Sequence, residues 1–339
     1  MIKKFLSLAA ISIFLFSCSS DDDSTTAIYE TDYSDGIFIV NEGNFGTPNA
    51  SVSSVSADLT NVSNNIFQNA NNGRALGDVA QSMTFSGDYA YIVVNSSNVV
   101  EVVNKHDFTS IATISEEMSS PRYAVVENNK LYVTQMATQA KKVTVYNATT
   151  FEYIQSIDLG FQPELIVEEN DKIYVSANTF STSNKLAIIN PTTDTVEETL
   201  VFDAPINGLT TGNDQVFVLT TNASETIISK IENNVATTAS THNVGNARYL
   251  EFDTNKLYFT SNLNIYEVAT TANANATVLF TVTDNSWSSL YGFEVFDGRI
   301  FTSDAKAFTE DGVITIYNTA GTILKTFRSG VGPNGFYKD

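Results

Sequence analysis

The side chains of this sequence that could do chemistry suit binding better than catalysis. Eight of them occupy comparable places in a repeating pattern and form the candidate ligand site: Asn44, Phe45, Arg122, Tyr123, Asn178, Arg248, Tyr249 and Tyr291. The two guanidinium groups could each pair with a carboxylate or phosphate through two hydrogen bonds. The tyrosine rings could stack on a flat molecule. This combination predicts a site for a neutral or weakly anionic organic ligand.

Most catalytic arrangements are missing from the sequence, although paired carboxylates could still meet across the ring. Its two histidines, His106 and His242, lie in different repeats without the spacing of metal ligands, and each is expected at a turn or on the surface. No glycine-rich phosphate loop, GxSxG elbow or HExxH motif is present. We therefore expect a protein that is not an enzyme, with no catalytic residue, metal or cofactor.

A motif that recurs down the chain must position the candidate site. Its aromatic residues are Tyr91, Tyr132, Tyr174, Phe217, Tyr258 and Phe301, at intervals of 41, 42, 43, 41 and 43 residues. An early copy places Phe38 at the aromatic position, 53 residues before Tyr91. A period of about 40 to 45 residues with short β-rich segments is typical of a four-stranded propeller blade. The seven copies predict an all-β protein, a seven-bladed β-propeller with four-stranded antiparallel blades; six blades is the alternative.

One repeat shows how the strands of a blade follow one another. Apolar or alternating segments at 123–127, 131–134, 143–147 and 153–159 are separated by short polar turns. We expect the asparagines that end the third strands to form turns: Asn104, Asn147, Asn190 and Asn318. Asp297-Gly298 and Asp311-Gly312 are typical of hairpin turns.

Both ends of the repeat region fit a closed ring. Gly36–Val40 matches a second strand, and Gly335–Tyr337 resembles a first strand without its partners. Pairing the two would complete one blade and remove an exposed sheet edge. The long first interval predicts an insertion within Asn64–Asp78, expected as a loop. Residues 35–339 should therefore form a single propeller domain.

The first residues have the pattern of a secretory signal. Lys3 and Lys4 precede an apolar run, Phe5–Phe16, which is too short to span a membrane. Cys18, the sole cysteine, follows a small residue, and residues 1–18 resemble a lipoprotein signal peptide with a lipobox, in which this cysteine is lipidated. A plain signal peptide with a chance cysteine is the alternative.

An acidic run follows the cysteine. Asp21-Asp22-Asp23 resembles the surface-export signal of Bacteroidetes lipoproteins, with an ordinary solvated linker as the alternative. Residues 19–34 are expected to be an acidic, polar and disordered linker. The predicted location is the outer membrane, lipid-anchored and exposed at the cell surface.

The net charge argues against some partners. The formal charge is −20, and it becomes −22 when the signal with Lys3 and Lys4 is removed. Phosphate backbones and anionic lipid surfaces repel such a body, so nucleic acid is not expected and membrane contact is expected through the lipid anchor only.

The candidate residues share one face of the predicted ring. In a propeller, the loop before each first strand and the loop after each second strand open on the same face, where pockets tend to form. By register this face also carries Glu42, Gln81, Glu164, Asn207, Trp287 and Asn334.

The repeats resemble the YVTN/YncE-like β-propeller family. The opening Asn41-Glu42-Gly43-Asn44-Phe45-Gly46 and the ending Gly332-Pro333-Asn334-Gly335-Phe336 resemble a Bacteroidetes branch of surface lipoproteins, over residues 36–339. The resemblance implies capture of a corrinoid such as cobalamin and its delivery to a TonB-dependent outer-membrane receptor. No ligand-contact motif matches residue by residue.

Three classes of function therefore stay open. The first is a binding module that captures a small-molecule ligand, with cobalamin as the named candidate. The second is an interaction module for a polysaccharide or a partner protein. The third is a propeller enzyme of the lactonase or quinoprotein type, which the scarcity of histidine disfavours. Fold alone cannot choose among them, because propellers host unrelated functions.

Overall fold

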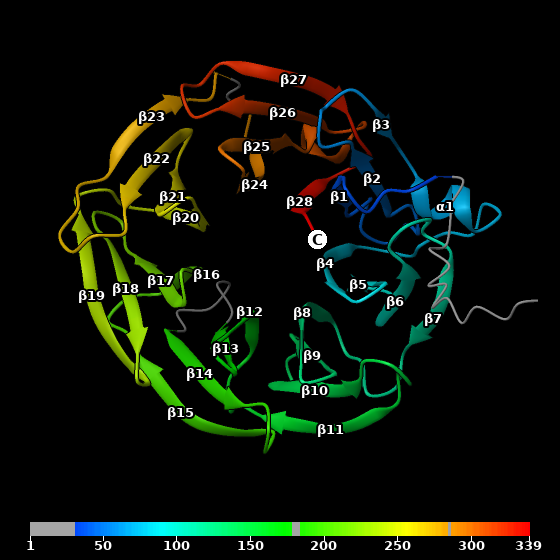
Figure 1. The fold of residues 1–339 in the computed structure, drawn as a ribbon, viewed down its shortest axis with the longest axis horizontal. Coiled ribbons are helices and arrows are strands. Elements are labelled where there is room, and N and C mark those ends of the chain that lie inside the picture. Colours follow the sequence, from blue (N-terminus) through cyan, green and yellow to red (C-terminus); the bar gives the residue numbers. More distant parts are fainter. Residues whose placement is uncertain (1–30, 178–183, 284–285) are drawn as a thin grey trace, which may run out of the picture.

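The chain forms a closed ring of seven blades around a central axis (Figure 1). The computed structural model describes residues 31–177, 184–283 and 286–339. Each blade is a four-stranded sheet in which every neighbouring pair of strands is antiparallel. The predicted all-β, seven-bladed propeller is confirmed.

Six blades take four consecutive strands each, from the axis outward. The first three are β4 (Ala80–Ser86), β5 (Tyr89–Val94), β6 (Val99–Asn104), β7 (Ser110–Ile114); β8 (Pro121–Glu127), β9 (Lys130–Gln135), β10 (Lys142–Asn147), β11 (Tyr153–Asp158); and β12 (Pro163–Glu169), β13 (Lys172–Ala177), β14 (Lys185–Asn190), β15 (Thr195–Val201). The next three are β16 (Ile206–Gly212), β17 (Gln215–Thr221), β18 (Thr226–Glu232), β19 (Val235–His242); β20 (Ala247–Asp253), β21 (Lys256–Ser261), β22 (Asn264–Ala269), β23 (Thr277–Thr281); and β24 (Ser289–Phe296), β25 (Arg299–Asp304), β26 (Val313–Asn318), β27 (Ile323–Arg328).

The remaining blade joins the two ends of the domain. Its order is β28 (Pro333–Tyr337), β1 (Ile37–Asn41), β2 (Ser51–Val55) and β3 (Val62–Ser63), so its innermost strand comes from the C-terminal end. The register pairs Phe38 with Tyr337, Ile39 with Phe336 and Val40 with Gly335. The predicted closure is confirmed, and Phe336 is buried against Phe301 of the preceding blade, with ring centroids 5.6 Å apart.

The recurring motif forms the second strand of each blade. Its residues are buried on both faces of the sheet, as in β9 and β13, because neighbouring blades pack on either side. Fourth strands such as β15 and β27 lie at the periphery and are largely exposed. The core is therefore a series of apolar layers between blades, and the aromatic residue of each motif fills one of them.

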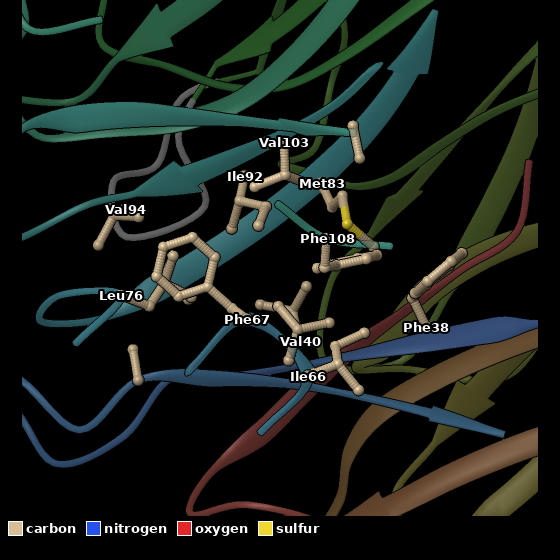
Figure 2. Close-up of a cluster of buried hydrophobic side chains, with 14 residues drawn as sticks. Phe38, Val40, Ile66, Phe67, Leu76, Met83, Ile92, Val94, Val103 and Phe108 are labelled. Atoms are coloured by element: carbon tan, nitrogen blue, oxygen red, sulfur yellow. The ribbon is translucent and has the colours of Figure 1, made fainter. Parts of the chain in front are cut away.

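The insertion after β3 is not only a loop, in contrast to the prediction. It contains a short helix, α1 (Ile66–Ala70), whose Ile66 and Phe67 are fully buried between the first two blades along the chain (Figure 2). In Figure 2 these side chains lie beside Val40 and Leu76. Burying an isoleucine and a phenylalanine contributes about 1.5–3 kcal/mol each, which holds a helix too short to be stable alone.

Most of the predicted turns are confirmed. Asn128 and Asn129 have φ of 51° and 58°, and Asp297-Gly298 has φ of 51° and 69°, the left-handed geometry of tight hairpins. Asn147 accepts hydrogen bonds from the backbone N–H groups of Thr149 and Thr150, both at 2.8 Å. Asp311-Gly312 is different: it ends a longer connection that contains the 3₁₀ helix η1 (Lys306–Phe308).

The structure corrects two further details. Asp32 and Tyr33, expected in the disordered linker, contact the propeller: the Tyr33 N–H donates to the His106 carbonyl at 2.8 Å, and its ring meets Phe108 edge-on at 5.9 Å. His242, expected at a turn or on the surface, is 6 % exposed at the end of β19, and burial lowers its pKa. Within the described ranges, no helix has the length and apolar character to span a membrane. Cys18 and residues 19–30 lie outside the described part.

Candidate functional site

A β-bulge opens the innermost strand of every blade, and these bulges build the site. The register shifts at Ala80/Ser82, Pro121/Ala124, Pro163/Ile166, Ile206/Gly208, Arg248/Glu251, Ser289/Gly292 and Val40/Asn41 opposite β28. Bulges redirect side chains that a regular strand would point elsewhere. The residues in or beside them are the ones that surround the axis at one end of the ring, which we call the mouth: Gln81, Arg122, Tyr123, Glu164, Asn207, Tyr249, Tyr291 and Asn334.

The hydroxyl group that ends several copies of the motif supports these bulges. The Oγ1 atom of Thr134 accepts from the Tyr123 N–H at 3.0 Å and donates to the Glu164 carbonyl of the next blade at 2.9 Å. The Oγ atom of Ser303 likewise accepts from the Gly292 N–H at 2.7 Å and donates to the Pro333 carbonyl at 2.6 Å. These backbone groups would otherwise lack a partner, since the bulge interrupts the ladder. The polar end of the motif thus stabilises the mouth and joins adjacent blades.

The mouth leads into a cavity of about 270 Å³, which we call the funnel. Its walls combine tyrosine rings, carboxylates, guanidinium groups and amides. The lining residues are Glu42, Gln81, Arg122, Tyr123, Glu164, Leu165, Asn207, Gly208, Leu209, Arg248, Tyr249, Leu250, Glu251, Tyr291 and Asn334.

A second cavity, which we call the outer pocket, adjoins the funnel and shares Glu42, Gln81, Arg122 and Tyr291 with it. Its volume is about 440 Å³, within the usual size of ligand sites. The rest of its lining is Gly43, Asn44, Phe45, Val79, Asn95, Met136 and Phe308.

The structure brings together seven of the eight candidate residues. Arg122, Tyr123, Arg248, Tyr249 and Tyr291 line the funnel, and Asn44 and Phe45 line the outer pocket. Asn178 lies outside the described residues. Asn44 has a positioning role, because its Nδ2 donates to the Phe308 carbonyl at 2.7 Å and its Oδ1 accepts from Asn49 at 3.0 Å.

The two arginines differ in how much they could offer a ligand. Arg122 is nearly buried and donates from Nε and Nη2 to one oxygen of Glu164, at 2.9 and 2.5 Å, and from Nη1 to Gln81. Arg248 is exposed, and its guanidinium forms no hydrogen bond or ion pair with a described residue; the guanidinium carbon lies 5.6 Å from the centre of the Tyr249 ring. Of these two arginines, Arg248 is therefore the one whose guanidinium has no partner among the described residues and could pair with an anion on a ligand.

Buried acids give the funnel unusual protonation equilibria. Burial raises the pKa of Glu42, although the hydroxyl of Tyr291, at 2.9 Å, and the amide of Asn334, at 2.9 Å, donate to its carboxylate. Burial also raises the pKa of Glu164 and outweighs the opposite effect of Arg122. The tyrosines stay neutral, since burial raises the pKa of both Tyr249 and Tyr291.

Two carboxyl groups on neighbouring innermost strands form a second titrating unit. Burial and the contact between them raise the pKa of Glu251 on β20, and burial raises the pKa of Glu294 on β24 to about 7. The nearby Tyr337 stays neutral, because burial raises the pKa of its hydroxyl well above the usual range. The pair therefore holds a shared proton near neutral pH.

Several residues of the site were not among the eight candidates. Glu42, Gln81, Glu164, Asn207 and Asn334 were placed on the correct face by register but not selected. Phe308 follows the second strand of its repeat, so the same register would have found it. Glu251 and Glu294 stand opposite Tyr258 and Phe301, where other repeats carry Val125 and Val167, and an acid at that position was a usable signal.

The fold and the site define this protein as a seven-bladed β-propeller with ligand-sized cavities at one mouth. The chain belongs to the domain-of-unknown-function family DUF5074, whose family model matches residues 35–298. No curated protein matches it.

Solved structures share the fold at low sequence identity. A quinoprotein alcohol dehydrogenase-like protein from Bacteroides thetaiotaomicron has a TM-score of 0.64 and 13% identity, covering 89% of this chain and 77% of its own. Hydrazine synthase from Kuenenia stuttgartiensis has a TM-score of 0.63 and 12% identity, covering 76% and 88%. BamB from Moraxella catarrhalis has a TM-score of 0.55 and 12% identity, covering 87% and 83%. At such identities these likenesses concern the propeller fold alone.

Proposed function

We propose that this protein captures an organic ligand at its mouth, and that the ligand is a corrinoid such as cobalamin. The observation that carries the proposal is an aromatic surface that begins in solvent and ends in the funnel. Trp287, 72 % exposed, stacks on Phe308 with ring centroids 6.3 Å apart, and Phe308 meets Tyr291 edge-on at 5.2 Å. Exposed apolar surfaces next to a cavity mark sites of interaction.

Phe45 adds a second exposed ring, and its loop is held rigidly. The side chain is 87 % exposed, yet the N–H groups on either side of it are fixed: Asn44 donates to Asn49 at 2.8 Å, and Gly46 donates to the Asp78 carboxylate at 3.0 Å. Gly43 donates to the Val331 carbonyl at 2.9 Å. A preorganised aromatic side chain loses little freedom when a ligand binds, so its contact area contributes to affinity.

A corrinoid suits this mouth chemically. Its flat macrocycle could stack on the rings of Phe45 and Trp287, and its peripheral amides could pair with amide and carboxylate side chains such as Gln81 and Glu42. Calorimetry with cobalamin tests the proposal. Binding should weaken about 5- to 150-fold in Phe45→Ala and in Trp287→Ala, because each ring supplies about 1–3 kcal/mol of stacking. Ile323→Ala, which removes a 59 % exposed side chain from the outer strand β27, is the matched control. Cobalamin that fails to bind, or binds all three variants alike, contradicts the proposal.

The same proposal includes a lipid anchor at Cys18 and delivery of the ligand to a TonB-dependent outer-membrane receptor. Asp32 and Tyr33 attach at the turn between β6 and β7, which lies at the end of the ring opposite the mouth. A tether from that end directs the mouth away from the anchoring surface. The 13 residues between Cys18 and Asp32 reach about 45 Å when extended, enough to allow contact with a neighbouring receptor.

The anchor and the surface location have their own test. Cys18→Ala should release the protein from membranes, whereas replacing Asp21, Asp22 and Asp23 by alanine should leave it membrane-bound but shielded from external protease. Unchanged protease sensitivity in the triple variant would remove the surface-export part of the proposal.

A further inference from the structure

Three carboxyl groups, Glu42, Glu164 and Glu251, line the funnel together with two guanidinium groups, Arg122 and Arg248. We call the part of the funnel around Glu164 and Glu251 its floor. Arg122 is committed to Glu164 and Gln81. Glu251 touches Glu294, and no basic side chain in the described part of the chain forms an ion pair with either carboxyl. Two adjacent carboxyl groups must share a proton or bind a cation, because both cannot stay ionised without one.

Two buried oxygen atoms in the funnel have no hydrogen-bond donor. Glu164 is 4 % exposed, and its Oε2 atom has no donor; the Oδ1 atom of Asn334 has none either. Both residues line the funnel. Over the described ranges, each buried side-chain polar atom without a partner is an oxygen acceptor. Leaving such an oxygen without a donor costs free energy, so a ligand that brings N–H groups would be favoured over one that brings oxygens.

The tyrosine walls suit a cation. Tyr123, Tyr249 and Tyr291 line the funnel, and the guanidinium carbons of Arg122 and Arg248 already lie 5.9 and 5.6 Å from the first two ring centres. The tyrosine hydroxyls do not compete for the ligand, since Tyr291 donates to Glu42 and Tyr249 donates to the Tyr291 carbonyl at 2.5 Å. Aromatic rings beside carboxylates form the kind of site that recognises ammonium groups.

We propose that the floor of the funnel binds a positively charged N–H donor, a protonated amine, while the exposed rings of Phe45 and Trp287, which we call the rim, hold the rest of the ligand. This inference rests on the proposed function for the rim and names the chemistry of the ligand's inner end. A primary amide, which has N–H donors but no charge, should bind more weakly, and a carboxylate, which brings neither, should bind most weakly of the three. The Glu251–Glu294 pair supplies the negative charge, which the incoming cation stabilises in place of the shared proton.

Three probes that differ only in their end group test this site: 3-phenylpropylammonium, 3-phenylpropanamide and 3-phenylpropanoate. Calorimetry or ligand-observed NMR at about pH 8, where an alkylammonium keeps its proton, should give the order ammonium, amide, carboxylate. Glu251→Gln should weaken the ammonium about tenfold, the effect of one charge contact of roughly 1.4 kcal/mol. Glu294→Gln provides a second variant if Glu251→Gln fails to fold. Glu232→Gln, at the exposed end of β18, is the charge-matched control and should bind as the unchanged protein does.

The outcomes separate this inference from the corrinoid proposal. Ammonium that binds while cobalamin does not would support the floor site and remove the corrinoid. Cobalamin binding without any preference for the ammonium probe would overturn the floor site alone. Equal or tighter binding of the carboxylate, no binding of any probe, or an ammonium affinity that neither glutamine variant changes would also overturn it.

Discussion

Replacing Glu294 by glutamine should make the propeller more stable at alkaline pH and leave its stability in acid unchanged. Burial holds the pKa of Glu294 at about 7 in the folded protein, against 4.5 for a free glutamate. The folded state therefore binds this proton more tightly than the unfolded chain. The stabilisation is complete below pH 4.5 and is lost as the pH rises towards and through 7. Glutamine keeps a hydrogen-bond donor for Glu251 and never ionises, so the variant avoids that loss.

The magnitude follows from the difference in pKa. A shift from 4.5 to about 7 is worth roughly 3 kcal/mol at 1.36 kcal/mol for each pKa unit. Glu294 is only partly buried by its accessible surface, so solvent screening makes this value an upper limit. Above pH 8, the free energy of unfolding of the variant should exceed that of the unchanged protein by up to about 3 kcal/mol. Near pH 4.5 the two free energies of unfolding should be the same.

Urea unfolding across this pH range measures the effect, and the difference between the two proteins cancels the titrating groups that do not interact with Glu294; Glu251, which does, contributes to the difference. Glu232→Gln serves as the control, because it removes an exposed acid and should show no such trend. A difference that does not change with pH would refute the reasoning, and so would a variant that is less stable than the unchanged protein in alkali.

Three further variants test the ring, the floor and the rim. Phe336→Ala should lower the free energy of unfolding by about 3–5 kcal/mol, because a ring only 1 % exposed is lost from the blade that closes the structure. Deletion of residues 333–339 should lower the melting temperature further. An unchanged melting temperature after this deletion would contradict the closure. Glu164→Gln should cost about 3–5 kcal/mol in chemical unfolding, since Arg122 would keep a buried charge without its partner; a loss below 1 kcal/mol would show that water reaches the pair. Phe45→Ala should change stability by less than about 0.5 kcal/mol, because the ring is 87 % exposed, and a large loss would assign Phe45 to the fold instead of the ligand.

Much of the fold could be predicted because each blade is a local structure that repeats. The motif residues, such as Tyr132 and Tyr174, keep their spacing, and turn residues such as Asn128-Asn129 separate the strands. The helix α1 could not be predicted. Five residues are too few to display a helical period, and the helix forms because Ile66 and Phe67 are buried between blades.

The position of the site was predictable, but its internal partners were not selected. Register placed Arg122 at the mouth, while the partners that occupy its guanidinium come from other blades: Gln81 stands 41 residues before it and Glu164 stands 42 after it. Glu251 and Glu294 are likewise one repeat apart. Side chains one period apart in the sequence are neighbours around the mouth, so an aligned set of repeats would have shown these pairs.

The pairing of β28 with β1 also determines when the ring can be completed during synthesis. Phe38 and Tyr337 are partners across almost the whole length of the domain, so the last blade has no inner strand until Pro333–Tyr337 emerge. Before that moment the edge of β1 is open, and the chain is exposed to edge-to-edge association and to proteases. A chain that stops early keeps that edge, and its lower stability distinguishes it from a finished one. The pairing of β28 thus couples the stability of the whole ring to synthesis of the chain through Tyr337.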